Sequence, residues 1–108
     1  MTLAEFNKKW DSATYNAMMN SKENWDKKYS KYVEDCYTMY EHYGFTDTFE
    51  TTYSEKTANN GLKFKVLRRA TTKDGFDLEV LPAWEIECEN GDKFMAFPEE
   101  ICKIERNN

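Results

Sequence analysis

Apolar residues alternate with acidic residues between Asp77 and Glu89, in the C-terminal part of the chain. The two sets are Leu78, Val80, Trp84, Ile86 and Cys88 on one side, and Asp77, Glu79, Glu85, Glu87 and Glu89 on the other. A period of two predicts a β-strand with one buried face and one acidic face. Because Pro82 cannot donate to a strand ladder, the pattern predicts either one strand bent at Pro82 or two shorter strands.

Asn90-Gly91 follows this stretch and predicts a β-hairpin. A two-residue loop would set Glu89 opposite Asp92, which brings two negative charges together. A three-residue loop with Gly91 in the left-handed region places apolar side chains opposite each other and opposite charges together. This second register, which we predict, gives the pairs Ile86–Phe94, Trp84–Ala96 and Glu87–Lys93.

Another strand is predicted from Leu62 to Ala70, upstream of the alternating stretch. Apolar Leu62, Phe64 and Val66 alternate there with Lys63 and Lys65. Leu67 interrupts the alternation, which indicates a β-bulge, and Arg68-Arg69 follow it. The segment from Thr71 to Phe76 contains Asp74-Gly75 and is predicted to be an exposed loop.

The run Phe97-Pro98-Glu99-Glu100-Ile101 predicts a single helical turn, because proline suits the first turn and acidic residues suit its positive end. A short closing strand is predicted from Cys102 to Glu105. This order of elements resembles the end of SH3-like barrels. The resemblance covers residues 62–105 and implies the barrel shape. It does not imply recognition of proline-rich peptides, because Ile101 stands where those SH3 domains have their groove tyrosine.

Two amphipathic helices are predicted before the barrel. Thr2 and Glu5 form a capping box, and an apolar stripe then continues to about Met19 through Leu3, Phe6, Trp10, Ala13 and Ala17. A second stripe consists of Trp25, Tyr29, Tyr32, Cys36, Met39 and Tyr43. Its phase is displaced by one residue, about 100° of helix, so we predict a break near Asn20 and Ser21. Gly44 is predicted to end the second helix.

The expected fold is therefore α+β and a single domain, residues 1–108. A helical hairpin (residues 2–43, Thr2 to Tyr43) packs on a small antiparallel SH3-like barrel (residues 62–105, Leu62 to Glu105). Residues 44–61 form a connector that docks on the barrel through Phe49 and Tyr53, with a short helix near Ser54.

Composition and charge narrow the function. Hydrophobic residues make up 40% and aromatic residues 16% of the chain, which indicates a globular protein. The net charge of -5 is spread along the sequence, which argues against non-specific nucleic-acid binding and agrees with a basic partner. No apolar run is long enough for a membrane span, and Met1 to Trp10 lacks a signal peptide's apolar centre. We expect a cytoplasmic protein, in a bacterial or host-cell cytosol, with no membrane partner.

The sequence offers little catalytic chemistry. His42 is the sole histidine, and adjacent Glu41 points about 100° away on a helix, so the two do not form a catalytic pair. Cys36, Cys88 and Cys102 form no CxxC motif and are expected to be reduced core residues. Glu85, Glu87 and Glu79 could share a cation on one sheet face, but Lys93 opposite Glu87 already offers a partner. We expect no enzyme activity, no metal site and no cofactor.

Protein binding is the function that we expect. The candidate residues are the acidic row Glu79, Glu85, Glu87 and Glu89, with Tyr37 and Tyr40 of the second helix. These two tyrosines either pack between the partner helix and the barrel or form an aromatic binding face. A homo-oligomer that uses the tyrosine-rich helix is a further hypothesis.

The small acidic domain without catalytic residues resembles phage-encoded inhibitors of bacterial defence, such as anti-CRISPR proteins. This resemblance, which is one of size and charge, implies a basic nucleic-acid-processing protein as the partner, with carboxylates placed where phosphates would lie. The alternative is a nucleic-acid-binding accessory protein that uses the basic strand Lys63, Lys65, Arg68 and Arg69.

Overall fold

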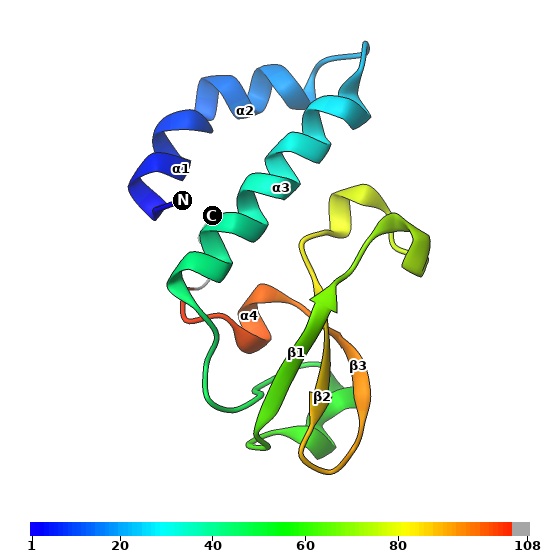
Figure 1. Ribbon diagram of the computed structural model, residues 1–108. Helices are drawn as coiled ribbons and strands as arrows, with labels where there is room; N and C mark the ends of the chain where they lie inside the picture. The colour runs from blue at the N-terminus through cyan, green and yellow to red at the C-terminus, as the bar shows by residue number, and fades with distance from the viewer. Residues whose placement is uncertain (105–108) are drawn as a thin grey trace.

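The computed structural model describes residues 1–104, which form a layer of helices above a small sheet (Figure 1). The helical layer consists of α1 (Leu3–Lys9), α2 (Ser12–Met19) and α3 (Trp25–Tyr43). The antiparallel sheet has the order β1-β2-β3, with β1 (Phe64–Arg69), β2 (Trp84–Cys88) and β3 (Lys93–Ala96). Helix α4 (Pro98–Ile101) lies near the junction of the two layers. The expected α+β class is confirmed.

The capping box at the start of α1 is confirmed. The Thr2 hydroxyl accepts a hydrogen bond from the Glu5 backbone N–H, and the Glu5 carboxylate accepts one from the Thr2 N–H. The expected single helix to Met19 is wrong, because the chain leaves helical geometry at Trp10 and begins again at Ser12.

Asp11 explains where the second helix starts. Its carboxylate accepts from the Thr14 backbone N–H at 2.8 Å, which is the hydrogen bond of an N-cap residue. The break rotates α2 relative to the predicted stripe. Met18 is therefore buried and Tyr15 partly buried, whereas Ala13 and Ala17 are exposed.

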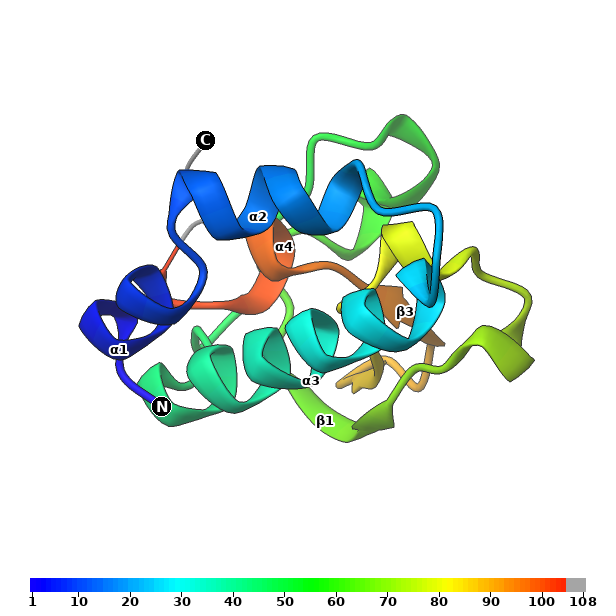
Figure 2. The same ribbon diagram turned by 90° about the horizontal axis from the view of Figure 1, so that it is seen from above.

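Helix α3 ends at Gly44 as predicted, and α1 and α2 lie along it (Figure 2). Tyr32 is at the centre of this contact. Four aromatic rings, those of Phe6, Trp10, Tyr15 and Tyr29, have centroids within 5.3 to 5.6 Å of the Tyr32 ring. This cluster packs the three helices against each other through edge and tilted aromatic contacts.

The sheet confirms the predicted hairpin. Ile86 pairs with Phe94, Trp84 with Ala96 and Glu87 with Lys93, which is the register of the three-residue loop. Gly91 has a φ of 91°, in the left-handed region that this loop requires. The predicted bulge is also confirmed, because the pairing of β1 with β2 shifts between Val66 and Arg68.

The predicted SH3-like barrel is wrong, since the three strands form an open sheet. Leu78–Val80 is a 3-10 turn, η3, so the predicted strand begins only at Trp84. The Leu81–Pro82 peptide bond is cis. After α4, Cys102 makes an isolated bridge with Phe45 instead of beginning a closing strand. The end of that predicted strand at residue 105 lies outside the described residues.

Trp84 and the connector complete the core. The ring of fully buried Trp84 has edge contacts with Tyr37, Tyr40 and Phe45. Phe49 docks the connector as predicted, because its side chain is fully buried. The short helix predicted near Ser54 is a 3-10 helix, η1 (Ser54–Asn59). Within residues 1–104, no helix has both the length and the apolar character needed to cross a bilayer.

Candidate protein-binding surfaces

The acidic face predicted for the sheet lies on its central strand, next to a basic strand. Lys65 on β1 lies opposite Glu87 on β2, and the Lys65 Nζ is 3.3 Å from a carboxylate oxygen. Arg68 lies opposite Glu85, with 3.1 Å between the Arg68 Nε and a carboxylate oxygen. Lys93 of β3 is the neighbour of Glu87 on its other side. This face of the sheet therefore carries paired charges of both signs.

The other two predicted acidic residues lie apart from this row. Glu79 is exposed on η3, because the segment forms a turn where a strand was expected. Glu89 is exposed in the hairpin loop, where its carboxylate accepts a hydrogen bond from the Lys63 backbone N–H. The four glutamates do not form a continuous acidic surface.

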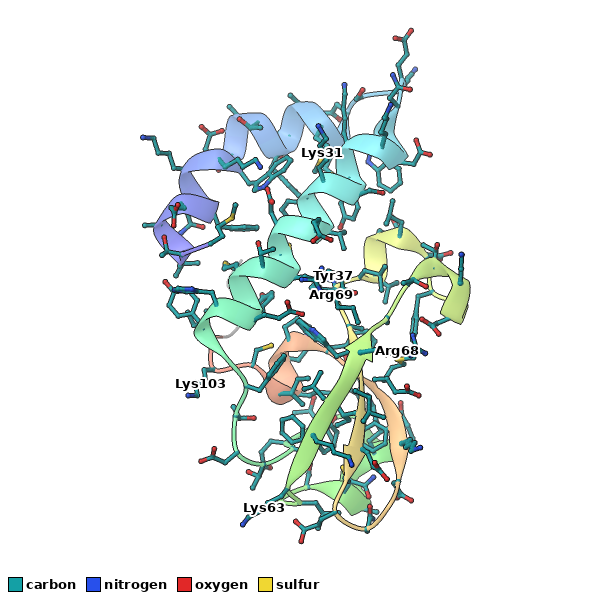
Figure 3. The ribbon with its side chains drawn as sticks, viewed as in Figure 1. Lys31, Tyr37, Lys63, Arg68, Arg69 and Lys103 are labelled. Atoms are coloured by element: carbon teal, nitrogen blue, oxygen red, sulfur yellow. The ribbon has the colours of Figure 1, made fainter. Side chains whose placement is uncertain are left out.

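The predicted basic strand is also held by carboxylates. Arg68 binds Asp74 at 2.8 Å in addition to Glu85, which ties β1 to the following loop. The hydrogen bonds from Arg68 lower the pKa of Asp74 well below its usual range. Among the described residues, Lys63 is the member of this basic set that has no carboxylate within ion-pair distance. Figure 3 shows Lys63 and Arg68 at opposite ends of β1.

Arg69 points to α3 at the junction of the helices and the sheet (Figure 3). Its guanidinium donates two parallel hydrogen bonds to Glu41, of 2.7 and 2.9 Å, and one of 2.8 Å to Glu34. The guanidinium also lies 4.8 Å from the centroid of the Tyr37 ring. These contacts lower the pKa of Glu41, mainly through the hydrogen bonds from Arg69. Arg69 thus joins the two layers.

Tyr37 and Tyr40 do not form an exposed aromatic face. Their side chains are only 4% and 2% exposed, because α3 packs on both the other helices and the sheet. The Tyr37 hydroxyl hydrogen-bonds to the Ala70 carbonyl at 2.9 Å and accepts from the Ala83 N–H at 3.2 Å. Burial raises the pKa of the Tyr37 phenol. Of the two readings of these tyrosines, packing is the one that the structure supports.

Several predicted residues of both signs meet in one shallow groove at the hairpin end of β1 and β2. The groove has a volume of about 330 Å³, and its walls include Lys63, Lys65, Glu87 and Glu89. Partly buried Phe64 lies between these charges. Because lysine and glutamate alternate around it, the groove favours neither an anionic nor a cationic ligand.

An exposed aromatic residue with carboxylates around it lies elsewhere, where the connector meets α4. Tyr53 is 41% exposed, and its hydroxyl donates to the Glu99 carboxylate at 3.2 Å. Glu50 is anchored beside α4 by its backbone N–H, which donates to the Glu100 carbonyl. Glu50, Glu55 and Glu99 are exposed, and none of them forms an ion pair within residues 1–104. We call these four residues, Tyr53, Glu50, Glu55 and Glu99, the Tyr53 surface.

The carboxylates near Tyr53 raise the pKa of its phenol. The charge of Glu99, then its hydrogen bond, and more weakly the charges of Glu100 and Glu55, raise the pKa of Tyr53. The sequence predicts that Tyr53 docks the connector on the barrel, whereas its side chain is exposed and hydrogen-bonds to Glu99. No sequence period unites residues 50, 55 and 99, so only the fold could bring them together.

A buried ion pair supports the Tyr53 surface from below. The Glu100 side chain is 1% exposed and binds the Lys56 Nζ at 3.0 Å, the Phe97 N–H at 2.9 Å and the Thr51 hydroxyl. The Lys56 Nζ also lies 5.1 Å from the centroid of the Tyr53 ring. Because Glu100 already neutralises Lys56, this lysine does not cancel the three exposed carboxylates.

Residues suited to catalysis are dispersed. His42 is exposed, and its ring stacks edge-on against Tyr43 at 5.3 Å. Cys36, Cys88 and Cys102 are buried, as expected of core residues, and burial raises the pKa of Cys102 to about 12. Within residues 1–104, no three histidine, cysteine or acidic side chains are grouped so that they could hold a metal ion.

The fold and these surfaces define an α+β protein with a three-helix layer on an open antiparallel sheet. Comparison of the chain with protein-family models, with curated proteins and with solved structures found no match.

Proposed function

We propose that this protein is a non-catalytic protein-binding module whose Tyr53 surface binds a basic surface of a partner protein. The observation that carries the proposal is the exposed Tyr53 side chain beside Glu55 and Glu99, whose carboxylates form no ion pair within the described chain. Charges that the protein leaves uncompensated are free to pair with a partner, whereas Glu85 and Glu87 already pair with β1.

The chemistry of the Tyr53 surface suits arginine and lysine side chains. Carboxylates bind guanidinium groups through charge-assisted, often bidentate, hydrogen bonds. An exposed tyrosine ring can stack on the same guanidinium, and tyrosine supplies much contact area at little entropic cost. Electrostatic complementarity of this kind raises the association rate and excludes partners of the same charge.

The partner class that we propose is a nucleic-acid-processing protein with a basic surface. The resemblance to anti-CRISPR proteins in size and charge supports this choice, and the net charge of -5 agrees with it. In this proposal the carboxylates occupy the positions of nucleic-acid phosphates, and the protein acts as an inhibitor.

The test is affinity capture from a bacterial lysate, with and without nuclease, by three forms of the protein. These are the wild type, the Tyr53-surface variant Glu55→Lys/Glu99→Lys and the sheet variant Glu85→Lys/Glu87→Lys, which changes the net charge equally. We expect one basic protein to remain bound after nuclease treatment, to dissociate as salt is raised and to be lost with the Tyr53-surface variant. Its affinity should fall about tenfold or more in that variant, measured with purified partner.

Other outcomes would redirect or overturn the proposal. Loss of binding with the sheet variant alone would place the interface on the originally expected acidic face. Loss of every partner after nuclease treatment would favour the nucleic-acid alternative, which predicts gel retardation that disappears when Lys63, Lys65, Arg68 and Arg69 are replaced by glutamate. Equal affinity of all three forms would rule out an acidic interface.

A further inference from the structure

A second surface, of opposite charge, lies between α2 and α3. A groove of about 260 Å³ opens there, lined by Trp10, Thr14, Ala17, Met18, Lys28 and Lys31. We call it the lysine groove. Figure 3 shows Lys31 on α3, on the side of the helix next to α2.

The apolar wall of the groove results from the helix break at Trp10. Met18 is buried and forms the packed side of α2, whereas Ala17 is exposed beside it. The Trp10 indole N–H donates to Asp35 at 2.8 Å, which fixes the ring at one end of the groove. Because alanine is small, it leaves room for a partner side chain to reach the apolar wall.

The rim of the groove is basic. Lys28 and Lys31 are exposed, and no ion pair among the described residues involves either of them. The Lys28 Nζ has a neutral partner, the Ser21 hydroxyl, at 3.1 Å. Asp35, four residues after Lys31 on the same helix, binds the Lys9 Nζ at 2.7 Å.

A third lysine adds to this positive charge. Lys27 is exposed in the first turns of α3 and stands four residues before Lys31, a spacing at which like charges on a helix repel. Lysines near a helix N-terminus also oppose the helix dipole. An anionic partner would relieve both unfavourable interactions.

We propose that the lysine groove binds an acidic segment of a partner protein. One apolar side chain of the segment enters the groove against Ala17 and Met18, and flanking aspartates or glutamates pair with Lys28 and Lys31. The groove is smaller than the ~300–1,000 Å³ of typical small-molecule pockets, which suits a single inserted side chain. This inference goes beyond the proposed function, because it adds a second and independent interface.

A peptide fits these features better than other anions do. A nucleic acid offers phosphates but no apolar side chain for the groove, and the Trp10 ring is held by Asp35 and packed on Tyr32. A membrane is bound by apolar side chains that protrude into it, whereas this apolar surface is recessed. A partner segment with apolar and acidic residues side by side matches both the wall and the rim.

The test is selection of twelve-residue peptides from a random phage-displayed library on the purified full-length protein. We expect enriched sequences with one leucine, phenylalanine or tryptophan flanked by aspartate or glutamate. The synthetic form of the most enriched peptide, labelled with fluorescein, is then titrated by anisotropy. The dissociation constant should rise about tenfold or more in Lys28→Glu/Lys31→Glu. It should rise similarly in Ala17→Trp, which fills the groove and leaves the charges unchanged.

Two controls separate this interface from the others. Lys8→Glu/Lys73→Glu changes the net charge equally at exposed lysines outside the groove and should alter the dissociation constant less than about twofold. Glu55→Lys/Glu99→Lys should also leave peptide affinity unchanged, so failure of the proposed function and failure of this inference give different results. Circular dichroism of each variant confirms that it is folded.

Three results would overturn the inference. The first is that no acidic sequences are enriched, and the second is that Lys28→Glu/Lys31→Glu binds the selected peptide as well as the wild type does. The third is that a single-stranded oligonucleotide or a vesicle of phosphatidylserine and phosphatidylcholine competes with the peptide, while Ala17→Trp leaves the dissociation constant of the peptide unchanged. That last result would indicate a general polyanion surface.

Discussion

At the scale of single residues, the Tyr37 hydroxyl shows how a polar group is accommodated in the core. Its ring packs edge-on against Trp84, and its hydroxyl satisfies the backbone of two segments that flank the sheet, at Ala70 and Ala83. A buried N–H without an acceptor costs free energy comparable to a lost hydrogen bond. Tyr37 therefore contributes through its polar atom as well as through its apolar ring.

We predict that Tyr37→Phe lowers the free energy of unfolding by about 1–3 kcal/mol, because it leaves the Ala83 N–H without an acceptor. Urea denaturation followed by tryptophan fluorescence measures the change. Tyr15→Phe is the matched control, since Tyr15 is partly buried against Tyr32 through its ring. A loss no larger than that of the control would show that water or a shifted backbone satisfies Ala83.

At the scale of elements, the break between α1 and α2 decides the shape of the helical layer. It allows both Trp10 and Tyr15 to pack against the Tyr32 ring on α3. A continuous helix would have kept Ala13 and Ala17 in the stripe instead, with less apolar area to bury. The cap at Asp11 makes the second start favourable.

We predict that Asp11→Ala destabilises the protein by about 0.5–2 kcal/mol, because it removes the acceptor for the Thr14 N–H. The midpoint of urea denaturation, measured by circular dichroism, should fall accordingly. Asp11→Asn keeps a side-chain oxygen and should recover most of the loss. If alanine and asparagine behave alike, the cap does not stabilise α2.

The contact between β1 and α3 should make stability depend on pH. The pKa of Glu41 is lowered in the folded protein, chiefly by hydrogen bonds from Arg69. At a pH just below the usual glutamate pKa, Glu41 is therefore protonated in the unfolded state but still ionised in the folded state. Stabilisation from Glu41 is thus complete above about pH 4.3 and decreases as pH falls through the lower folded-state pKa.

We predict that Glu41→Gln lowers the free energy of unfolding at pH 7 by about 1 kcal/mol, since the pair is partly exposed. The difference from the wild type should shrink as pH falls from 5 to 2, because protonation of Glu41 then removes the same charge. Urea denaturation at each pH measures it. A difference that stays constant with pH would show that Glu41 contributes by packing alone.

At the scale of the whole molecule, the Lys56–Glu100 pair holds the connector on the C-terminal part of the chain. It joins η1 to α4 across a sequence separation of 44 residues. The Glu100 carboxylate also accepts hydrogen bonds from the Thr51 hydroxyl and the Phe97 N–H, so both of its oxygens have partners. Removal of either charge would leave the other one buried.

We predict that Lys56→Met and Glu100→Gln each destabilise the protein by about 3 kcal/mol, and that the double variant loses much less than their sum. Urea denaturation of the four proteins gives the coupling energy. The exposed pair Lys65 and Glu87 is the control, with an expected coupling below about 1 kcal/mol. Additive losses at Lys56 and Glu100 would show that the two charges act independently.

The distribution of charge is also a property of the whole molecule. The sequence predicts one acidic strand and one basic strand. Their charged side chains form ion pairs with each other where β1 pairs with β2. Some of the carboxylates and lysines that form no such ion pair within residues 1–104 lie at the Tyr53 surface and at the lysine groove. The candidate interfaces therefore depend on which charges the fold leaves without an internal partner.

Local interactions allowed the sequence by itself to determine several elements. The Thr2 capping box, the end of α3 at Gly44, the bulge at Leu67 and the hairpin register each depend on residues close together in the chain or directly opposite each other. Their hydrogen bonds and side-chain pairs are the same in nearly any tertiary context, and so the prediction of an α+β protein was correct.

Only the tertiary structure decided the features that depend on distant segments. Leu78–Val80 became a turn although its period suited a strand, and the open sheet replaced the predicted barrel. Burial of Tyr37 and Tyr40 required the sheet beneath α3, and the Tyr53 surface required α4 beside the connector. Packing between distant segments decides which apolar stripe is buried and which charge forms an ion pair. The periodicity of a single segment does not specify that packing.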